Sequence, residues 1–251
     1  MQLFDLKGKV AIITGCNTGL GQGMAIGLAN VGADIVGVGV VGAAETQAQV
    51  EALGRKFHYI TADLMKQDNI DSIVNEAVEV MGHIDILVNN AGIIRRQDLL
   101  EFSNKDWDDV ININQKSVFF LSQAVARELV KQGKGGKIIN IASMLSFQGG
   151  IRVPSYTASK SAVMGLTRAL ANELSQYNIN VNAIAPGYMA TDNTAALRAD
   201  AARNDAILER IPAGRWGTPD DLAGPVIFLA SSASDYVTGY TLAVDGGWLA
   251  R

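Results

Sequence analysis

The sequence predicts an α/β protein in which helices cover both faces of a doubly wound, parallel, seven-stranded sheet. Short runs of β-branched residues alternate with longer segments of helical periodicity, which is the pattern of repeated β–α–β units. The 251 residues, 48% of them hydrophobic, can bury a large core. No internal repeat, low-complexity tract or flexible linker divides the sequence, so we expect residues 1–251 to form a single domain.

Strands and helices alternate along most of the chain. Strands are predicted at residues 10–14, 34–38, 57–61, 84–88, 137–142, 180–185 and 240–244. The main helices are predicted at residues 20–31, 69–81, 107–131, 154–177 and 220–231. Residues 188–217 depart from this alternation, because a long, charged, helical stretch lies there between a strand and the last helix. Long excursions from a compact domain are often functional, so we expect a lid over a ligand site at about 188–217.

Composition narrows the classes of partner. The formal charge of −4 and the isoelectric point near 5.2 show no excess of lysine and arginine, so a nucleic-acid partner is not expected. Cys16 is the single cysteine, which excludes an internal disulfide and, with two histidines, leaves too few ligands for a usual zinc site. We expect no metal and a cytoplasmic protein. The apolar run at residues 10–13 is too short for a signal sequence or a membrane span, so no membrane association is expected.

A glycine-rich loop follows the first predicted strand. Residues 14–21 are Thr-Gly-Cys-Asn-Thr-Gly-Leu-Gly, and an apolar helix begins within them. Glycines permit a tight turn and let backbone N–H groups approach a pyrophosphate at the helix N-terminus, where the helix dipole favours negative charge. The pattern alone is weak, but its place directly after the first strand predicts a Rossmann fold that binds a dinucleotide.

A second glycine pattern competes with the first. Gly37, Gly39 and Gly42 also match the spacing of a dinucleotide loop, and Asp63 follows at about the spacing expected of a ribose-binding acid. However, Gly37 falls inside the second predicted strand, and the helix expected after it, at residues 43–53, is weaker. The first loop is therefore favoured. The alternative role of the second pattern is a close contact between helix and strand, with room beside the adenine ribose.

Tyr156 and Lys160 are candidates for proton chemistry. They lie four residues apart at the start of a predicted helix, so the phenol and the ammonium share one face. A cation about 4.5 Å from the phenol, at an effective dielectric constant of about 20, would favour the phenolate by roughly 3.7 kcal/mol. We therefore expect Lys160 to lower the pKa of Tyr156 towards the working pH. The alternative is an ordinary surface pair at helical spacing.

Four segments at the ends of predicted strands should meet at one edge of the sheet. They are the glycine loop, residues 90–92 after the fourth strand, Ser143 after the fifth and residues 186–187 after the sixth. The carboxyl ends of the strands border the ligand crevice in an open α/β sheet. Their convergence predicts an active site that combines a dinucleotide loop with Ser143, Tyr156 and Lys160.

With these motifs, the sequence resembles the short-chain dehydrogenase/reductase family over essentially its whole length. The shared residues are T-G-x-x-x-G-x-G at 14–21, Asp63-Leu64, N-N-A-G at 89–92, Asn114, Ser143, Y-x-x-x-K at 156–160 and P-G-x-x-x-T at 186–191. The resemblance implies an oxidoreductase that transfers hydride to and from a nicotinamide cofactor. It also implies a homotetramer.

The resemblance further implies a role for each shared residue. In that family a serine binds the substrate oxygen, a tyrosine transfers the proton, a lysine holds the nicotinamide ribose, and an asparagine supports a water in the proton relay. These catalytic roles fall on Ser143, Tyr156, Lys160 and Asn114. The positions implied for cofactor binding are Gly15, Asn17, Thr18, Gly19, Leu20, Gly21, Gly39, Asp63, Leu64, Asn90, Ala91, Gly92, Tyr156, Lys160, Pro186, Gly187, Met189 and Thr191.

Residues 135–160 and 210–236 resemble more closely those members of the family that oxidise or reduce six-carbon keto and hydroxy acids in pectin breakdown, with NAD. This resemblance implies a small, anionic sugar acid as substrate. Ser143, Gln148, Arg96 and Arg152 are the expected substrate contacts, because an arginine fork suits a carboxylate. The alternative is that these arginines are surface charges or oligomer contacts.

The end of the second predicted strand bears on cofactor choice. Members of the family that prefer NAD usually carry an acid there, whereas this chain has Gly39. No lysine or arginine lies in the glycine loop or at residues 36–44 to hold a 2′-phosphate, so NAD is favoured over NADP.

Two other function classes remain open. A reductase of 3-oxoacyl thioesters would want an apolar acyl channel, whereas Gln148, Arg152 and Arg96 suggest a polar, anion-accepting pocket; a gluconate 5-dehydrogenase is a closer variant of the favoured function. A non-catalytic nucleotide sensor would not need Ser143 with Tyr156 and Lys160, so the intact set argues against it.

Overall fold

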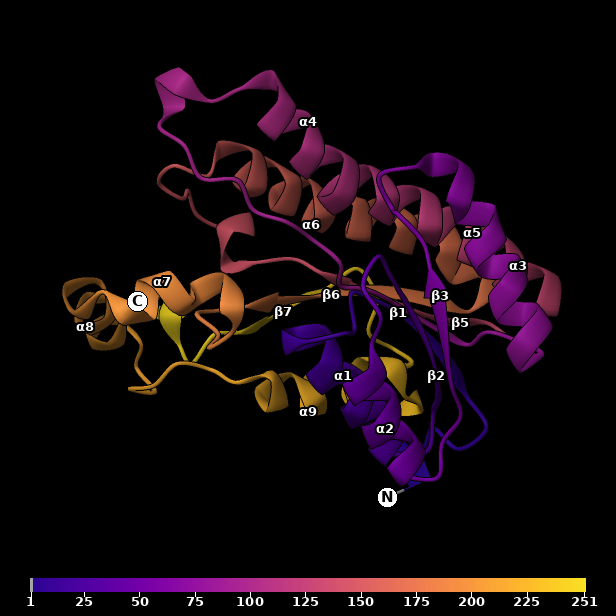
Figure 1. Cartoon of the computed structure of the whole chain (residues 1–251). Coiled ribbons are helices and arrows are strands. Elements are labelled where there is room, and N and C mark those ends of the chain that lie inside the picture. The colour runs from indigo at the N-terminus through magenta and orange to yellow at the C-terminus, as the bar shows by residue number, and fades with distance from the viewer. Residues whose placement is uncertain (1) are drawn as a thin grey trace.

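Seven parallel strands form one sheet at the centre of the computed structural model, which describes residues 2–251 (Figure 1). The strand order is β3-β2-β1-β4-β5-β6-β7, as expected of a Rossmann fold. The predicted strands are confirmed, with shifts of one or two residues at several ends. They are β1 (Val10–Thr14), β2 (Asp34–Gly39), β3 (Phe57–Thr61), β4 (Ile86–Asn89), β5 (Gly136–Ile141), β6 (Ile179–Pro186) and β7 (Thr241–Val244).

Helices cover both faces of the sheet (Figure 1). One layer contains α1 (Gly19–Asn30), α2 (Ala44–Ala52) and α9 (Ala223–Ala230). The opposite layer contains α3 (Ile70–Met81), α4 (Asn104–Ile111), α5 (Ser117–Gln132) and α6 (Pro154–Leu174). Among the described residues, none of the helices is long and apolar enough to cross a membrane.

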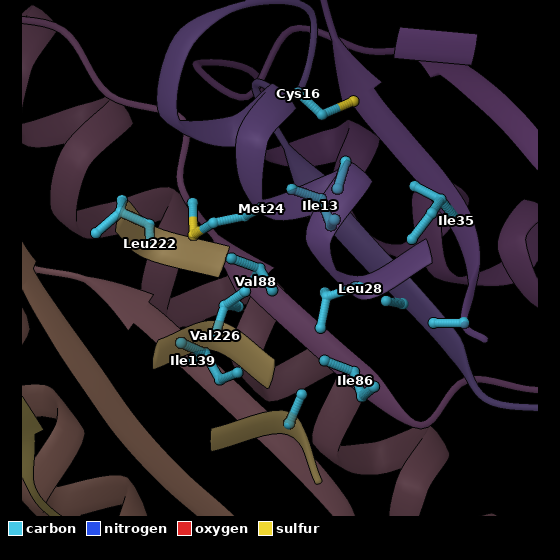
Figure 2. Close-up of a cluster of buried hydrophobic side chains, with 14 of the residues drawn as sticks. Ile13, Cys16, Met24, Leu28, Ile35, Ile86, Val88, Ile139, Leu222 and Val226 are labelled. Atoms are coloured by element: carbon cyan, nitrogen blue, oxygen red, sulfur yellow. The ribbon is translucent and has the colours of Figure 1, made fainter. Parts of the chain in front are cut away.

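Each face of the sheet carries its own hydrophobic core. On the α1 side, Met24, Leu28 and Val226 from the helices pack against Ile13 and Ile139 from the strands (Figure 2). The opposite core joins the other faces of the same strands to α3 and α5. Burial on both faces explains why the central strands are apolar without alternation.

The sheet changes direction between β1 and β4, because the chain builds outward to β3 and then returns to the other side of β1. Ile13 pairs with Val88, and Val88 pairs with Ile139, so β1, β4 and β5 end along one edge. A topological switch point of this kind opens a crevice outside the carboxyl ends of the strands.

Two expected elements differ in detail. The predicted helix at 107–131 is two helices, α4 and α5, joined by a π-helical turn at Asn112–Lys116. A π turn inserts one residue into the helical ladder, and Asn114 within it is held by two bonds to the backbone of Ile93. The excursion at 188–217 folds into the short helices α7 (Ala195–Ala199) and α8 (Ala201–Arg210), which lie beside the C-terminus (Figure 1).

Candidate active site

A cleft of about 1470 Å³ follows the carboxyl edge of the sheet. Pockets for single small molecules are roughly 300–1,000 Å³, so this cleft has room for a dinucleotide and a small substrate together. Every residue expected to contact substrate lines it, namely Ser143, Gln148, Arg96 and Arg152. The expected cofactor contacts that line it are Gly15, Asn17, Thr18, Gly19, Leu20, Gly21, Gly39, Asp63, Leu64, Asn90, Ala91, Gly92, Tyr156, Lys160, Gly187 and Thr191.

Two expected cofactor contacts lie outside the lining of this cleft. Pro186 is buried at the end of β6. Met189 is also buried, 5% exposed, and belongs to the hydrophobic core under α1. Their neighbours Gly187 and Thr191 line the cleft instead, because the chain turns between β6 and the excursion that follows.

The loop after β1 has the shape of a phosphate cradle. Gly15 has φ +65°, and a Cβ on Gly21 would lie 2.1 Å from the carbonyl oxygen of Gly15, so neither position accepts a larger residue. Asn90 Nδ2 donates to the carbonyls of Thr14 and Gly15 at 2.9 and 3.0 Å and fixes the turn. The side chain of Thr18 does not cap α1, and the first turn of α1 contains no acid. Its free N–H groups are therefore suited to a pyrophosphate.

The second glycine pattern serves packing. A Cβ on Gly37 would lie 2.6 Å from Cys16 Sγ and 2.9 Å from the ring of Tyr59. Burial raises the pKa of the Cys16 thiol to about 11, which keeps it neutral in the core. Gly37 is thus small because Cys16 and Tyr59 occupy the adjacent space, and the loop at residues 15–21 is the better phosphate site.

Tyr156 and Lys160 lie on one face of α6, as predicted. Lys160 Nζ is 5.7 Å from the centroid of the Tyr156 ring. It donates to the carbonyl oxygen of Ile141, at the end of β5, at 2.6 Å. Ser143 follows β5 directly, and its hydroxyl accepts from the backbone N–H of Leu145 at 3.1 Å. The strand end and the helix together place the serine, the phenol and the ammonium around one part of the cleft.

The pKa of Tyr156 differs from the expectation. Burial raises it above 10, and a hydrogen bond with Ser143 and the positive charge of Arg96 oppose that rise in part. The prediction that Lys160 lowers this pKa towards neutrality is therefore wrong for the protein alone, because desolvation outweighs the hydrogen bond with Ser143 and the charge of Arg96. The phenol is protonated at pH 7 and can donate its proton.

Burial also lowers the pKa of Lys160, from 10.5 to about 8. Between these pH values the unfolded chain binds more protons than the folded chain, so the free energy of unfolding should rise with pH. Relative to Lys160→Met, the unmodified protein should gain on the order of 3 kcal/mol as the pH rises from about 8 to beyond 10.5. Urea unfolding at several pH values measures this, with Lys134→Met at an exposed site as control. A flat or falling difference would contradict the buried, easily deprotonated state of Lys160.

Asn114 supports the cleft from behind. It is fully buried, and its side chain exchanges hydrogen bonds with the backbone of Ile93 at 2.8 and 2.9 Å. Nδ2 also lies 3.2 Å from Ser159 Oγ, which connects the π turn to α6. Ile93 lines the cleft next to Gly92. Asn114 thus connects α6 to the chain segment after β4.

The arginines expected from sequence have different surroundings. Arg152 forms an ion pair with Asp98 at 2.9 Å, and both side chains are more than half exposed. Arg96 Nη2 donates to the carbonyl of Asn193 at 3.3 Å, and its charge acts on Tyr156. Sequence reasoning missed Arg210 and Trp248, which also line the cleft. Arg210 belongs to the charged stretch at residues 188–217, which was expected to cover a ligand site. No sequence pattern indicated Trp248.

Comparison with known proteins shows the family of this chain. A family model described as Enoyl-(Acyl carrier protein) reductase matches residues 15–249. The chain belongs to the short-chain dehydrogenase/reductase family. As a member of that family it is an oxidoreductase, which is the class that the resemblance of its sequence motifs implied.

Individual relatives in the short-chain dehydrogenase/reductase family cover the full chain. It is 70% identical over 251 residues to the 2-dehydro-3-deoxy-D-gluconate 5-dehydrogenase of Escherichia coli K12, covering 100% of this chain and 99% of that one. It is 69% identical, with the same coverage, to the enzyme of the same name from Dickeya dadantii. The crystal structure of a gluconate 5-dehydrogenase from Burkholderia cenocepacia J2315, in complex with NADP and tartrate, superposes with a TM-score of 0.94 at 41% identity, covering 100% and 98% of the two chains.

Proposed function

We propose that this chain transfers hydride reversibly between NAD(H) and the C5 alcohol of a six-carbon keto-deoxy sugar acid of the 2-dehydro-3-deoxy-D-gluconate type. The observation that carries the proposal is the meeting of Ser143, Tyr156 and Lys160 with arginines in one cleft. The 70% identity to an enzyme named for this reaction supports it. The proposal includes a cytoplasmic location, which the single cysteine favours, and a homotetramer, which the family resemblance supports.

The proton chemistry falls on Tyr156. In the reductive direction its phenol donates a proton to the carbonyl oxygen, and in the oxidative direction the phenolate takes the proton of the alcohol. Ser143 holds the same oxygen by hydrogen bonding. Lys160 and Asn114 support the arrangement of the serine and the phenol. Lys160 Nζ donates to the carbonyl of Ile141, and Asn114 Nδ2 donates to Ser159 Oγ on α6. The nicotinamide ring, when bound, accepts or supplies the hydride.

The residues present fit a dinucleotide. The loop at residues 15–21 would hold the pyrophosphate, and Asp63, which lines the cleft, would lie near the adenine. In the part of the chain that the structure describes, the cations lining the cleft are Lys160 and arginines 96, 152, 203 and 210. None of them belongs to the loops after β1, β2 and β3, which favours NAD over a cofactor with a 2′-phosphate.

Tyr59 occupies the place that an acid at the end of β2 would need. A Cβ on Gly39 would lie 2.7 Å from Tyr59 Oη and 3.8 Å from the next atom, Cζ. Tyr59 Oη also donates to the carbonyl of Val41, so it cannot move freely. Gly39→Asp should therefore lower the thermal midpoint by several degrees and weaken NAD binding, because overpacking costs about 1–3 kcal/mol.

A double variant separates the clash from the charge. Gly39→Asp with Tyr59→Phe removes the one atom within 3.8 Å, so stability and NAD binding should recover, while NADP binding stays weaker than in the unmodified protein. Tyr59→Phe alone is the control. Equal losses in the single and double variants would rule out the clash, and a preference of the unmodified protein for NADP would rule out the proposed cofactor.

A substrate panel tests the proposed function directly. The panel contains 2-dehydro-3-deoxy-D-gluconate, 2-deoxy-D-gluconate, D-gluconate and, in the reverse direction, a 3-oxoacyl thioester, each followed at the absorbance of reduced nicotinamide. We expect the highest kcat/KM with a keto-deoxy acid. The best activity on the thioester would favour an acyl reductase, and tight NAD binding without any turnover would favour a nucleotide sensor.

A further inference from the structure

We infer that Arg210 binds the carboxylate of the substrate and that Trp248 holds its guanidinium in place. Arg210 is the last residue of α8, and its side chain lines the same cleft as Ser143 and Tyr156. The inference rests on the proposed function, because it assigns the acid group of the proposed substrate. It gives the excursion at residues 188–217 a direct role in substrate choice.

The guanidinium of Arg210 is held but not neutralised. It lies over the indole ring of Trp248, 3.9 Å from the ring centroid, and Nη2 is 3.5 Å from Gln148 Oε1. Within residues 2–251 it forms no ion pair. A cation over an aromatic face keeps its N–H groups available at the edge, where they match the two oxygens of a carboxylate. Arg210 is therefore oriented for an anion before the anion arrives.

Trp248 gives this arginine a rigid support. Its side chain is 5% exposed and packs with Met144, Ile207 and Ile211 in one hydrophobic cluster. The ring of Tyr188 makes an edge contact with it at 4.7 Å between centroids. Because Met144 directly follows Ser143, the same cluster connects the base of α8 to the loop that carries the serine. The position of Arg210 relative to the reacting groups is thus set by packing.

The other cations suit the carboxylate less well. Arg152 is paired with Asp98, and Lys160 is bonded to the carbonyl of Ile141. Arg96 lines the cleft, but its Nη2 donates to the carbonyl of Asn193. Arg203 also lines the cleft, but among residues 2–251 no aromatic ring supports its guanidinium as Trp248 supports that of Arg210. Arg210, beside Gln148, is therefore the cation best prepared to bind the carboxylate.

Matched substrates and variants test this assignment. The acid is 2-dehydro-3-deoxy-D-gluconate, and its neutral counterpart is 3-deoxy-D-erythro-hexos-2-ulose, which has an aldehyde in place of the carboxylate. The variants are Arg210→Ala and Arg210→Met, of which the latter keeps an aliphatic stem over Trp248. Arg203→Ala, on the same helix and lining the same cleft, tests the competing arginine. Arg127→Ala, at an exposed position of α5 outside the cleft lining, is the control. Thermal midpoints verify that each variant is folded.

Both Arg210 variants should lower kcat/KM for the acid by about thirty-fold or more, mainly through KM, and change that of the neutral compound less than about threefold. Arg127→Ala should change neither by more than about threefold, and Arg96→Ala should lower kcat for both. If the acid-to-neutral ratio survives in the Arg210 variants, or falls equally in Arg203→Ala, Arg210 is not the anchor although the proposed function stands. If the unmodified protein shows no preference for the acid, the proposed substrate class and this inference both fail.

Discussion

Replacing Tyr156 by phenylalanine should lower kcat by about 100-fold or more while leaving the Kd for NAD within about threefold. The substitution removes one hydroxyl from the cleft and keeps the ring on α6. A positioned proton donor contributes roughly 10²–10⁴-fold to a rate, and this hydroxyl is the one that we assign to proton transfer. Stopped-flow turnover and NAD titration by protein fluorescence measure the two quantities separately.

Tyr177→Phe is the matched control for this variant. Tyr177 is 45% exposed and lies just beyond the other end of α6, so its hydroxyl should have no effect on kcat. If Tyr156→Phe keeps more than about a tenth of kcat, a loss below ~1.4 kcal/mol, the assignment of Tyr156 as the proton donor is wrong.

Lys160→Ala should damage both cofactor binding and turnover. The substitution removes the hydrogen bond that Lys160 Nζ donates to the carbonyl of Ile141, together with a cation 5.7 Å from the centroid of the Tyr156 ring. We expect a loss of about 100-fold or more in kcat/KM, divided between a weaker Kd for NAD and a lower kcat. Equilibrium titration with NAD and steady-state kinetics on the same preparation separate the two parts.

Lys160→Arg separates charge from shape at this position. It keeps a cation, but the larger guanidinium must enter a site where the lysine is only 4% exposed. Its activity should fall between that of Lys160→Ala and the unmodified protein. If Lys160→Ala lowers kcat without changing the Kd for NAD, Lys160 acts on the phenol alone and the cofactor role implied by family resemblance is wrong.

The central strands were predictable because burial on both faces leaves apolar runs that no helical period explains. β1 and β3 coincide with their predicted ranges. The π-helical turn between α4 and α5 was not predictable, because it depends on a contact between Asn114 and the backbone of Ile93, far away in sequence. Periodicity within one segment carries no information about such a tertiary contact.

In the candidate site, too, features set by local sequence could be predicted and features set by tertiary contacts could not. The Tyr156–Lys160 pair could be predicted, since residues four apart on a helix share a face. The raised pKa of the phenol could not, because helical spacing says nothing about desolvation or about Lys160 Nζ turning to Ile141. The role of Arg210 depends on its contact with Trp248, and α9 and β7 separate these two residues in the sequence. Only the folded chain brings these two side chains together.

Direct observation of hydride transfer tests the central claim most directly. 2-Dehydro-3-deoxy-D-gluconate carrying deuterium at C5 is incubated with the enzyme and NAD, and the reduced cofactor is analysed by mass spectrometry. We predict that nearly all of the reduced nicotinamide formed will carry one deuterium. Turnover that yields unlabelled reduced cofactor would place the reaction at another carbon, and the absence of any reduced cofactor would contradict sugar-acid oxidation by this chain.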